Sequence, residues 1–372
     1  MAVRLKHRWS ITHNYLAGIT AAGWYRLLRE NKFDVDWEYW HRAAFITVAS
    51  LINSFYCRKE KRLYDAAVQR VKITQPPLFI LGHWRSGTTL LHNLLTQDSD
   101  QFAYANTYQV VNPHTFLSTE EVNSKRFAAL VPTKRPMDNM ELSFQTPQED
   151  EFAPLLLTFR SLYLGISFPR REDYYSRYLT FRDVPRKEIE AWKAGFEWFL
   201  KKLTFKHGRA LVLKSPPHTA RIRILLEMFP NARFVHIHRD PYAVFQSSRH
   251  YFDTATWYTY LQRPELDGMD ERIIRRYTTL YDAFFEDKVM IPSGQFHEVC
   301  FEDLERDPLN ELRMLYEKLT LPGFHALEPK LKVYVDSLSG YRKNEFPELS
   351  HALRRKVAEV WRRTFDEWGY AR

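Results

Sequence analysis

Cysteine and long apolar runs are both scarce in this chain of 372 residues. The two cysteines, Cys57 and Cys300, lie in unrelated segments, and no CxxC or Cys/His metal spacing surrounds them. The sequence therefore predicts neither a disulfide framework nor a zinc site, and a reducing compartment suits it best. The longest apolar stretch, residues 43–57, is interrupted by polar side chains and falls short of the roughly 18–20 clean apolar residues of a spanning helix.

Several sequence signatures are absent as well. The basic N-terminus is followed by polar residues rather than by the apolar core of a secretory signal. HExxH, GxSxG and EF-hand patterns do not occur, so metalloprotease, hydrolase and calcium-binding functions have no support. No internal repeat is visible. We therefore expect a cytoplasmic protein without a metal, and peripheral membrane association stays open.

Positive charge and aromatic side chains, by contrast, are plentiful. Lys and Arg number 54 against 45 Asp and Glu, which gives a formal net charge of +9, and aromatic residues make up 15% of the chain. The charge favours anionic partners such as nucleotides or an acidic membrane surface, although it equally serves solubility. The aromatic content favours a large core and an apolar substrate channel.

Residues 1–75 are expected to form a helical N-terminal extension. Apolar residues recur at helical spacing in two segments that Trp, Tyr and basic residues flank. Such segments suit a helical cap packed on the core, which we favour, or a helix that lies at a membrane interface. The apolar positions are Tyr15, Leu16, Ile19 and Ala22 in the first segment, and Phe45, Val48, Leu51 and Ile52 in the second.

From residue 77 onward, short apolar runs alternate with helix-like segments. The runs occupy residues 78–81, 210–213, 233–238 and 296–301. This alternation predicts an α/β domain at 76–372, with a parallel β-sheet flanked by helices on both faces. Ligands bind such sheets beyond the carboxyl ends of the strands. The proline- and aromatic-rich stretch at about 96–185 is expected to be an insertion over those ends that contacts substrate.

The segment from Gly82 to Thr89 follows the first of these runs. It reads Gly-His-Trp-Arg-Ser-Gly-Thr-Thr and nearly matches the P-loop pattern G-x-x-x-x-G-K-[ST]. The backbone N–H groups of such a loop converge on phosphate oxygens, and the following helix N-terminus favours negative charge. Thr88 stands where an NTPase carries its lysine, which disfavours magnesium-assisted chemistry at a γ-phosphate. Arg85 supplies positive charge from the other flank of the loop.

Two motifs resemble those of sulfotransferases that use 3′-phosphoadenosine-5′-phosphosulfate (PAPS). The first is similar to the family's 5′-phosphosulfate loop and comprises Arg85, Ser86, Gly87, Thr88, Thr89 and Leu90. The second is similar to the family's 3′-phosphate segment, in which Arg239 ends a strand-like run and Ser247 follows eight positions later. Because Ser247 lies about two turns into the next helix, both side chains can face one phosphate. The resemblance is strongest to bacterial-type carbohydrate and lipid sulfotransferases and to the tyrosylprotein group.

The resemblance implies in-line transfer of a sulfuryl group from PAPS to a hydroxyl or amine. Such a transfer needs cations near the leaving phosphate and a base for the acceptor. Arg85 and Lys214 are the cationic candidates, and Lys214 matches a family position where a lysine contacts the donor's bridging oxygen. Tyr341, Arg342 and Lys343 are loosely similar to a flap that closes over the nucleotide, or they form a solvated basic loop.

The catalytic base is less clearly marked. Tyrosylprotein and heparan-type relatives place a glutamate some twenty residues after the phosphate loop, where this chain has Asn106. An amide cannot take a proton as a carboxylate can. The remaining candidates are Glu149 and Glu151, at the head of an apolar helix, and His218, expected in the first turn of another helix. Each of them could instead cap its helix.

Two other functions remain as alternatives. A P-loop kinase or NTPase would leave the pair of Arg239 and Ser247 unexplained. A catalytically silent nucleotide-binding protein, docked on a membrane through its N-terminus, draws support from Asn106 at the family's glutamate position. The expected partners are a small-molecule, lipid or glycan acceptor, and no nucleic acid is expected.

Overall fold

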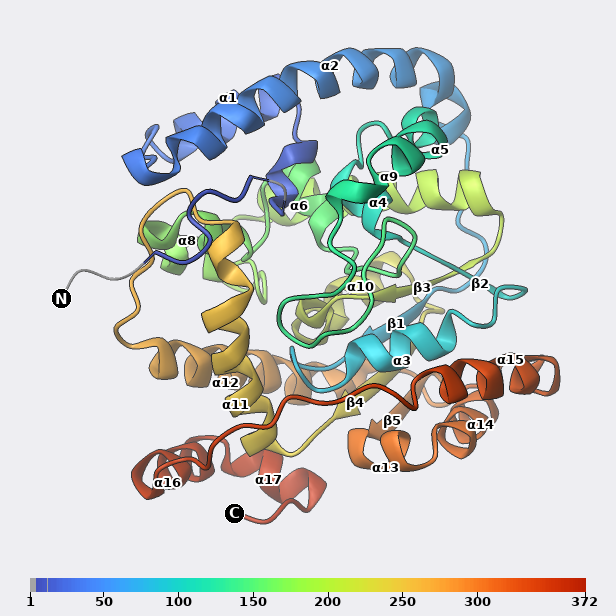
Figure 1. The fold of residues 1–372 in the computed structure, drawn as a ribbon. Helices are drawn as coiled ribbons and strands as arrows, with labels where there is room; N and C mark the ends of the chain where they lie inside the picture. Colours follow the sequence, from blue (N-terminus) through green and yellow to red (C-terminus); the bar gives the residue numbers. More distant parts are fainter. Residues whose placement is uncertain (1–4, 12) are drawn as a thin grey trace. The chain divides into compact units, whose positions relative to one another are not determined.

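The computed structural model describes residues 5–11 and 13–372, and Figure 1 shows the order of its elements. The chain forms two compact units. Unit 1 comprises Met1–Ile73, Ala105–Gly208 and Phe252–Asp267, and unit 2 comprises Thr74–Tyr104, Arg209–Tyr251 and Gly268–Arg372. Most of the predicted insertion at about 96–185 therefore shares a unit with the N-terminal helices. The domain boundaries at 75 and around the insertion stay predictions.

Unit 2 is built on a parallel sheet, which has five strands in the described part of the chain, in the order β2-β3-β1-β4-β5. The strands are β1 (Leu78–Leu81), β2 (Phe102–Tyr104), β3 (Ala210–Lys214), β4 (Arg233–His238) and β5 (Phe296–Cys300). In the register, Leu78 of β1 lies opposite Val212 on one side and Arg233 on the other. The parallel sheet predicted from the alternating runs is confirmed, and β2 adds an edge strand too short to be recognised in the sequence.

Helices cover both faces of this sheet. On one face, Ile80 and Val235 belong to a buried cluster that the sheet shares with four helices. These helices are α3 (Thr88–Leu95), α13 (Phe301–Arg306), α14 (Pro308–Lys318) and α15 (Phe324–Ser337). On the other face, the Phe79 ring contacts Phe229, next to α10 (Ile222–Met228). There too, His236 stacks on Phe284 of α12 (Met269–Asp287) and on Trp368 of α17 (Arg362–Trp368).

Two α-helices begin at a proline that follows an aspartate. Asp240 accepts hydrogen bonds from the backbone amides of Tyr242 and Ala243, at the first turn of α11 (Pro241–Thr254). Asp307 accepts one from the amide of Asn310 at the start of α14. In both cases an aspartate precedes a proline whose missing N–H is not needed at the first helical position.

One helix prediction was wrong in detail. His218 lies in the 3-10 helix η5 (Pro216–Ala220), and the α-helix expected from that residue begins only at Ile222. Consecutive prolines at 216 and 217 supply no amide hydrogens and favour this tighter turn. Near the C-terminus, Trp361 lies between α16 (His351–Val360) and α17 and stacks on Tyr277 at 3.6 Å.

Unit 1 is helical, and its longest element is α2 (Trp40–Gln69), seen in blue in Figure 1. The predicted helical character of residues 1–75 is confirmed in α1 (Ala21–Glu30) and α2. The inner face of α2 holds a buried ion pair between Glu60 and Lys202 at 2.5 Å. The other elements of the unit are η1 (Tyr15–Gly18), η2 (Trp37–Tyr39), α4 (Thr107–Val111), α5 (Phe116–Arg126), η3 (Ala128–Leu130), α6 (Phe152–Thr158), α7 (Leu164–Ser167), η4 (Pro169–Arg171), α8 (Glu172–Ser176), α9 (Arg186–His207) and η6 (Thr256–Tyr258).

Within residues 5–11 and 13–372, no helix is both long enough and apolar enough to pass through a bilayer.

Candidate functional site

The loop between β1 and α3 approaches its neighbours so closely that only glycine fits at two positions. Gly82 and Gly87 have φ angles of 145° and 99°, a region that side chains rarely adopt. A Cβ on Gly82 would lie 2.6 Å from the carbonyl oxygen of Ile237 in β4. A Cβ on Gly87 would lie 2.3 Å from the ring of Phe301 in α13. The loop is thus fixed against β4 and α13 by backbone contact.

Hydrogen bonds from several elements fix the shape of the loop. The buried hydroxyl of Thr219 accepts from the amide of Gly82 at 2.7 Å and donates to its carbonyl at 3.2 Å. The Ser86 hydroxyl donates to the His83 carbonyl at 2.8 Å, inside the loop. Gly87 is the N-cap of α3, so the loop leads directly into the N-terminus of that helix. This arrangement suits a bound phosphate.

The predicted phosphate-binding side chains of two motifs come together beside the loop. Nε of Arg85 donates to the hydroxyl of Ser247 at 2.9 Å. Arg239, at the end of β4, donates from Nη1 to the carbonyl of Arg85 at 3.2 Å. In this arrangement Arg85 lies on the side predicted for the 3′-phosphate, and Ser247 is buried on α11.

Arg239 is partly buried, close to charges of both signs. Burial lowers the pKa of Arg239, and the neighbouring charge of Arg85 lowers it further, whereas Glu302 raises it. The Arg239 guanidinium also lies 4.3 Å from the centroid of the Phe301 ring. Because a guanidinium stays charged in proteins, two arginine charges are held near each other, and an anionic ligand would relieve their repulsion.

His83 in the loop does not add to this charge. Burial lowers its pKa to about 3, although its hydrogen bond with the Trp84 carbonyl opposes the shift. The ring packs against Tyr277 at 4.9 Å. His83 is therefore neutral at physiological pH and serves packing.

Lys214 and His218 follow the strand next to β1. Lys214 is the last residue of β3, pairs in register with Ile80 and is 1% exposed. The sheet thus places Lys214 at the same carboxyl edge as the phosphate loop. His218 is fully buried in η5, where its ring contacts Phe79 at 5.4 Å.

The predicted flap lies in an exposed segment before α16, and part of it reaches this region. Nζ of Lys343 pairs with Glu305 at 2.6 Å and lies 6.0 Å from the Phe301 ring centroid. The Arg239 guanidinium also lies over this ring. Tyr341 and Arg342 are exposed, and the role of all three residues as a nucleotide flap stays a prediction.

The acidic candidates belong to unit 1, whereas the residues above belong to unit 2. In the described part of the chain, Glu151 is the N-cap of α6 but its side chain makes no cap hydrogen bond. Asp150 and Glu151 are fully buried. Glu149 is partly exposed, and its carboxylate accepts a hydrogen bond from the Tyr163 hydroxyl.

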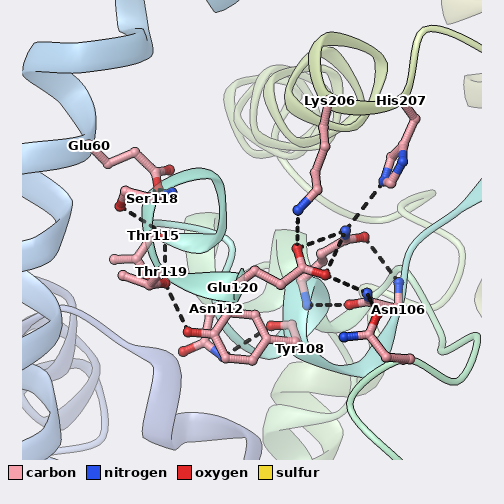
Figure 2. Close-up of polar contacts among 12 residues, drawn as sticks. Glu60, Asn106, Tyr108, Asn112, Thr115, Ser118, Thr119, Glu120, Lys206 and His207 are labelled. Atoms are coloured by element: carbon pink, nitrogen blue, oxygen red, sulfur yellow. Dashed lines mark hydrogen bonds and ion pairs between the residues drawn. The ribbon is translucent and has the colours of Figure 1, made fainter. Parts of the chain in front are cut away.

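Asn106 belongs to a network of polar contacts within unit 1, as Figure 2 shows. Its side-chain oxygen caps α4 by accepting from the amide of Gln109, and its amide group donates to Glu120 at 2.7 Å. Glu120 also pairs with Lys206 of α9 at 2.6 Å. Asn106 therefore links the start of α4 to α5, where the Glu120 carboxylate accepts its hydrogen bond.

Sequence reasoning missed three residues that shape the loop: Thr219, Phe301 and Glu302. Glu302 accepts a hydrogen bond from the amide of Asp240, at the junction that follows Arg239. Phe301 ends the apolar run at 296–301 and Glu302 follows it, which is a local signal for a site at the carboxyl ends of the strands. A single threonine in a 3-10 turn gives no such signal, since its role depends on the long-range contact with Gly82.

Comparison with known proteins agrees with this geometry. Residues 76–326 match the sulfotransferase family, and the chain therefore belongs to that family. The omega-hydroxy-beta-dihydromenaquinone-9 sulfotransferase Stf3 of Mycobacterium tuberculosis is 38% identical over 355 residues, which cover 95% of this chain and 91% of the relative. The protein of the same name from Mycobacterium bovis gives the same values.

Two solved structures share the fold. Sulfotransferase STF9 from Mycobacterium avium has a TM-score of 0.64 at 19% identity and covers 94% of this chain and 97% of its own. Sulfotransferase STF1 from Mycobacterium tuberculosis has a TM-score of 0.64 at 17% identity and covers 96% of this chain and 94% of its own. The family assignment makes this protein a sulfotransferase, with a sulfate donor as co-substrate, and favours that function over a kinase or a silent binder.

The hydroxyl of Thr219 offers a test of how the loop is held. Thr219→Val keeps the side-chain volume but removes both hydrogen bonds to Gly82, so we expect a loss of about 1–3 kcal/mol in the free energy of unfolding. Binding of an adenosine 3′,5′-bisphosphate should weaken too, because the loop loses its anchor. Thermal unfolding and calorimetry measure the two effects. Thr219→Ser keeps the hydroxyl and should retain most of the binding; equal binding by the valine variant would contradict the anchoring role.

Proposed function

We propose that this sulfotransferase moves the sulfuryl group of PAPS to a hydroxyl, or an amine, of an amphiphilic lipid-type acceptor. The observation that carries the proposal is the cluster of Arg85, Arg239 and Ser247 beside a phosphate loop without the NTPase lysine. A nucleotide with phosphates at both the 3′ and the 5′ position of its ribose would bind both to the phosphate loop and to the pair of Arg239 and Ser247. A nucleoside triphosphate would leave the pair of Arg239 and Ser247 without a role.

The described residues fit such a donor. The backbone of the loop and the first turn of α3, residues 85–90, would hold the 5′-phosphosulfate, because two glycines allow the close approach that a Cβ would block. Arg239 and Ser247 would hold the 3′-phosphate. We further propose that Arg85 contacts both the 5′ and the 3′ phosphate of the donor. Residues 341–343 would close over the donor, with Nζ of Lys343 near the Phe301 ring.

The transfer itself is an in-line displacement at sulfur. An acceptor oxygen forms a bond to sulfur while the bond from sulfur to the bridging oxygen of the 5′-phosphate breaks. The electron pair leaves with adenosine 3′,5′-bisphosphate, and the acceptor proton passes to a base. Lys214, at the sheet edge beside the loop, and Arg85 would stabilise the charge that develops on the leaving phosphate.

Glu149 is our first choice for the base, ahead of Glu151 and His218. Its carboxylate is partly exposed and is oriented by the Tyr163 hydroxyl, whereas Glu151 and His218 are fully buried. A base must come within hydrogen-bond reach of the acceptor, and a partly exposed carboxylate is more accessible to one than a fully buried group is.

The lipid character of the acceptor draws on two observations. The 38% identical relative Stf3 carries a menaquinone derivative in its name. This chain is also rich in aromatic side chains, at 15%. We propose that a hydroxylated, largely apolar molecule is the acceptor, and that the protein works in the cytoplasm at the membrane surface where such molecules reside. A glycan acceptor is the second candidate.

The direct test of the function is product formation. The purified chain is incubated with PAPS and a hydroxylated isoprenoid quinone, and mass spectrometry follows the sulfated product and adenosine 3′,5′-bisphosphate. Both should appear with the wild type and neither with Gly87→Ala, whose Cβ would clash with Phe301. Phosphorylation by magnesium-ATP, with no turnover of PAPS, would instead establish a kinase.

The arginine at the end of β4 should determine selectivity for the 3′-phosphate. Arg239→Ala removes charge-assisted hydrogen bonds, so the affinity for adenosine 3′,5′-bisphosphate should fall about 10- to 100-fold, while that for 5′-AMP should hardly change. Ser247→Ala should act in the same direction with a smaller effect. Isothermal titration calorimetry measures both nucleotides. Arg249→Ala, which removes an exposed arginine of α11 paired with Asp270, is the matched control; equal losses for both nucleotides in Arg239→Ala would refute the assignment.

The choice of base can be tested by isosteric substitution. Glu149→Gln should lower kcat about 10²- to 10⁴-fold because the amide cannot accept the acceptor proton. The affinity for adenosine 3′,5′-bisphosphate should stay the same, since Glu149 has no part in the donor cluster. Initial-rate kinetics with Glu149→Gln, Glu151→Gln and His218→Asn compare the candidates. Full activity in Glu149→Gln, with a loss in one of the other two variants, would move the role to that residue.

A further inference from the structure

The outer face of α2 exposes a continuous row of large apolar side chains. Each of the six is between 53% and 66% exposed. They recur at intervals that keep them on one side of a helix, and their positions are Trp40, Val48, Leu51, Ile52, Phe55 and Leu63. The opposite side of α2, with Ile46, Cys57 and Val68, is buried. The helix is therefore a cap of unit 1 on its inner face and an open apolar surface on its outer face.

The fully exposed charged side chains of α2 are all basic. Four exposed basic residues lie between Phe55 and Leu63 of the apolar row: Arg58, Lys59, Lys61 and Arg62. Glu60, in the middle of them, is turned inward, where Lys202 and the Ser118 hydroxyl bind its carboxylate. Asp65, the other acidic residue of α2, is only partly exposed. Glu38, just before the helix, is 2% exposed.

Aromatic residues mark the other end of the row. Trp37 and Trp40 are 65% and 66% exposed at the start of the helix. Arg8 lies 4.8 Å from the Trp37 ring, so a guanidinium accompanies the aromatic end as well. Indole rings and basic side chains beside an apolar stripe are the features of helices that lie in the plane of a membrane interface.

We propose that the outer face of α2, from Trp37 to Leu63, docks this enzyme on an anionic lipid bilayer. The helix lies flat, with the apolar row between the acyl chains and the basic residues among the head groups. At 1.5 Å per residue, the row from Trp40 to Leu63 is about 35 Å long, which suits a helix in the plane of the bilayer. A lipid surface fits better than a protein partner, because the exposed charge is basic throughout and the apolar row is flanked by interfacial residues.

This surface goes beyond the proposed reaction, since it concerns where the enzyme works and rests only on the exposure and charge of α2. Vesicle binding needs neither donor nor acceptor. Absence of vesicle binding would therefore leave the proposed sulfuryl transfer unaffected, and absence of sulfated product would leave the docking proposal unaffected.

Cosedimentation of the full chain with vesicles tests the docking surface. Vesicles of phosphatidylcholine alone are compared with vesicles that also contain phosphatidylglycerol, at moderate salt. The wild type should bind the anionic vesicles, and the double variant Leu51→Ser and Phe55→Ser should bind them about tenfold more weakly. The double variant Lys59→Glu and Arg62→Glu should lose the preference for anionic vesicles.

The matched control changes exposed apolar residues elsewhere. Val289→Ser with Val333→Ser alters side chains that are 78% and 72% exposed in unit 2 and should leave vesicle binding unchanged. All variants should unfold at the wild-type temperature, because the substituted side chains are exposed. The proposal is overturned if the wild type does not bind anionic vesicles, or if Leu51→Ser with Phe55→Ser binds as the wild type does. A dimer in sedimentation velocity that this variant dissociates would assign the face to a second copy instead.

Discussion

Backbone contact between the 82–89 loop, β4 and Phe301 is the constraint on which the donor site depends. Gly82 and Gly87 bring the main chain closer to Ile237 and to the Phe301 ring than any side chain would allow. That contact sets the direction in which α3 begins, and therefore where its first-turn amides point. It also brings the loop next to the end of β4, where Arg239 emerges. The proposed phosphate site on the parallel sheet thus depends on two glycines and one aromatic ring.

The charges of the site are arranged by the same contact. Arg85 reaches Ser247, and Arg239 holds the carbonyl of Arg85, so one residue of the loop joins the 5′ and the 3′ parts of the proposed donor site. The Arg239 guanidinium lies 4.3 Å from the centroid of the Phe301 ring, and Nζ of Lys343 lies 6.0 Å from it. Each arginine is hydrogen-bonded, yet their repulsion lowers the pKa of Arg239 beyond what burial does.

The sequence allowed the parallel sheet, the phosphate loop and the pair of Arg239 and Ser247 to be predicted because each rests on local spacing. A buried strand, a glycine turn and a helix start follow one another within a few residues, and so do an arginine and a serine eight positions apart. Thr219 could not be predicted, since its contact with Gly82 joins residues 137 positions apart. The role of Asn106 needed the structure for the same reason, as Glu120 and Lys206 come from other helices. The exposed row on α2 shows a further limit, because helical spacing of apolar residues does not say whether the face they share is covered.

The central claim is that the cluster of Arg85, Arg239 and Ser247 binds a nucleotide phosphorylated at both the 3′ and the 5′ position. A thermal-shift titration with adenosine 3′,5′-bisphosphate, 5′-AMP and magnesium-ATP measures this most directly. A ligand at one hundred times its dissociation constant stabilises the folded state by about 2.7 kcal/mol, which is readily detected. Our account predicts that adenosine 3′,5′-bisphosphate raises the unfolding temperature at concentrations where the other two have little effect. Equal shifts with 5′-AMP, or a dominant shift with magnesium-ATP, would contradict it.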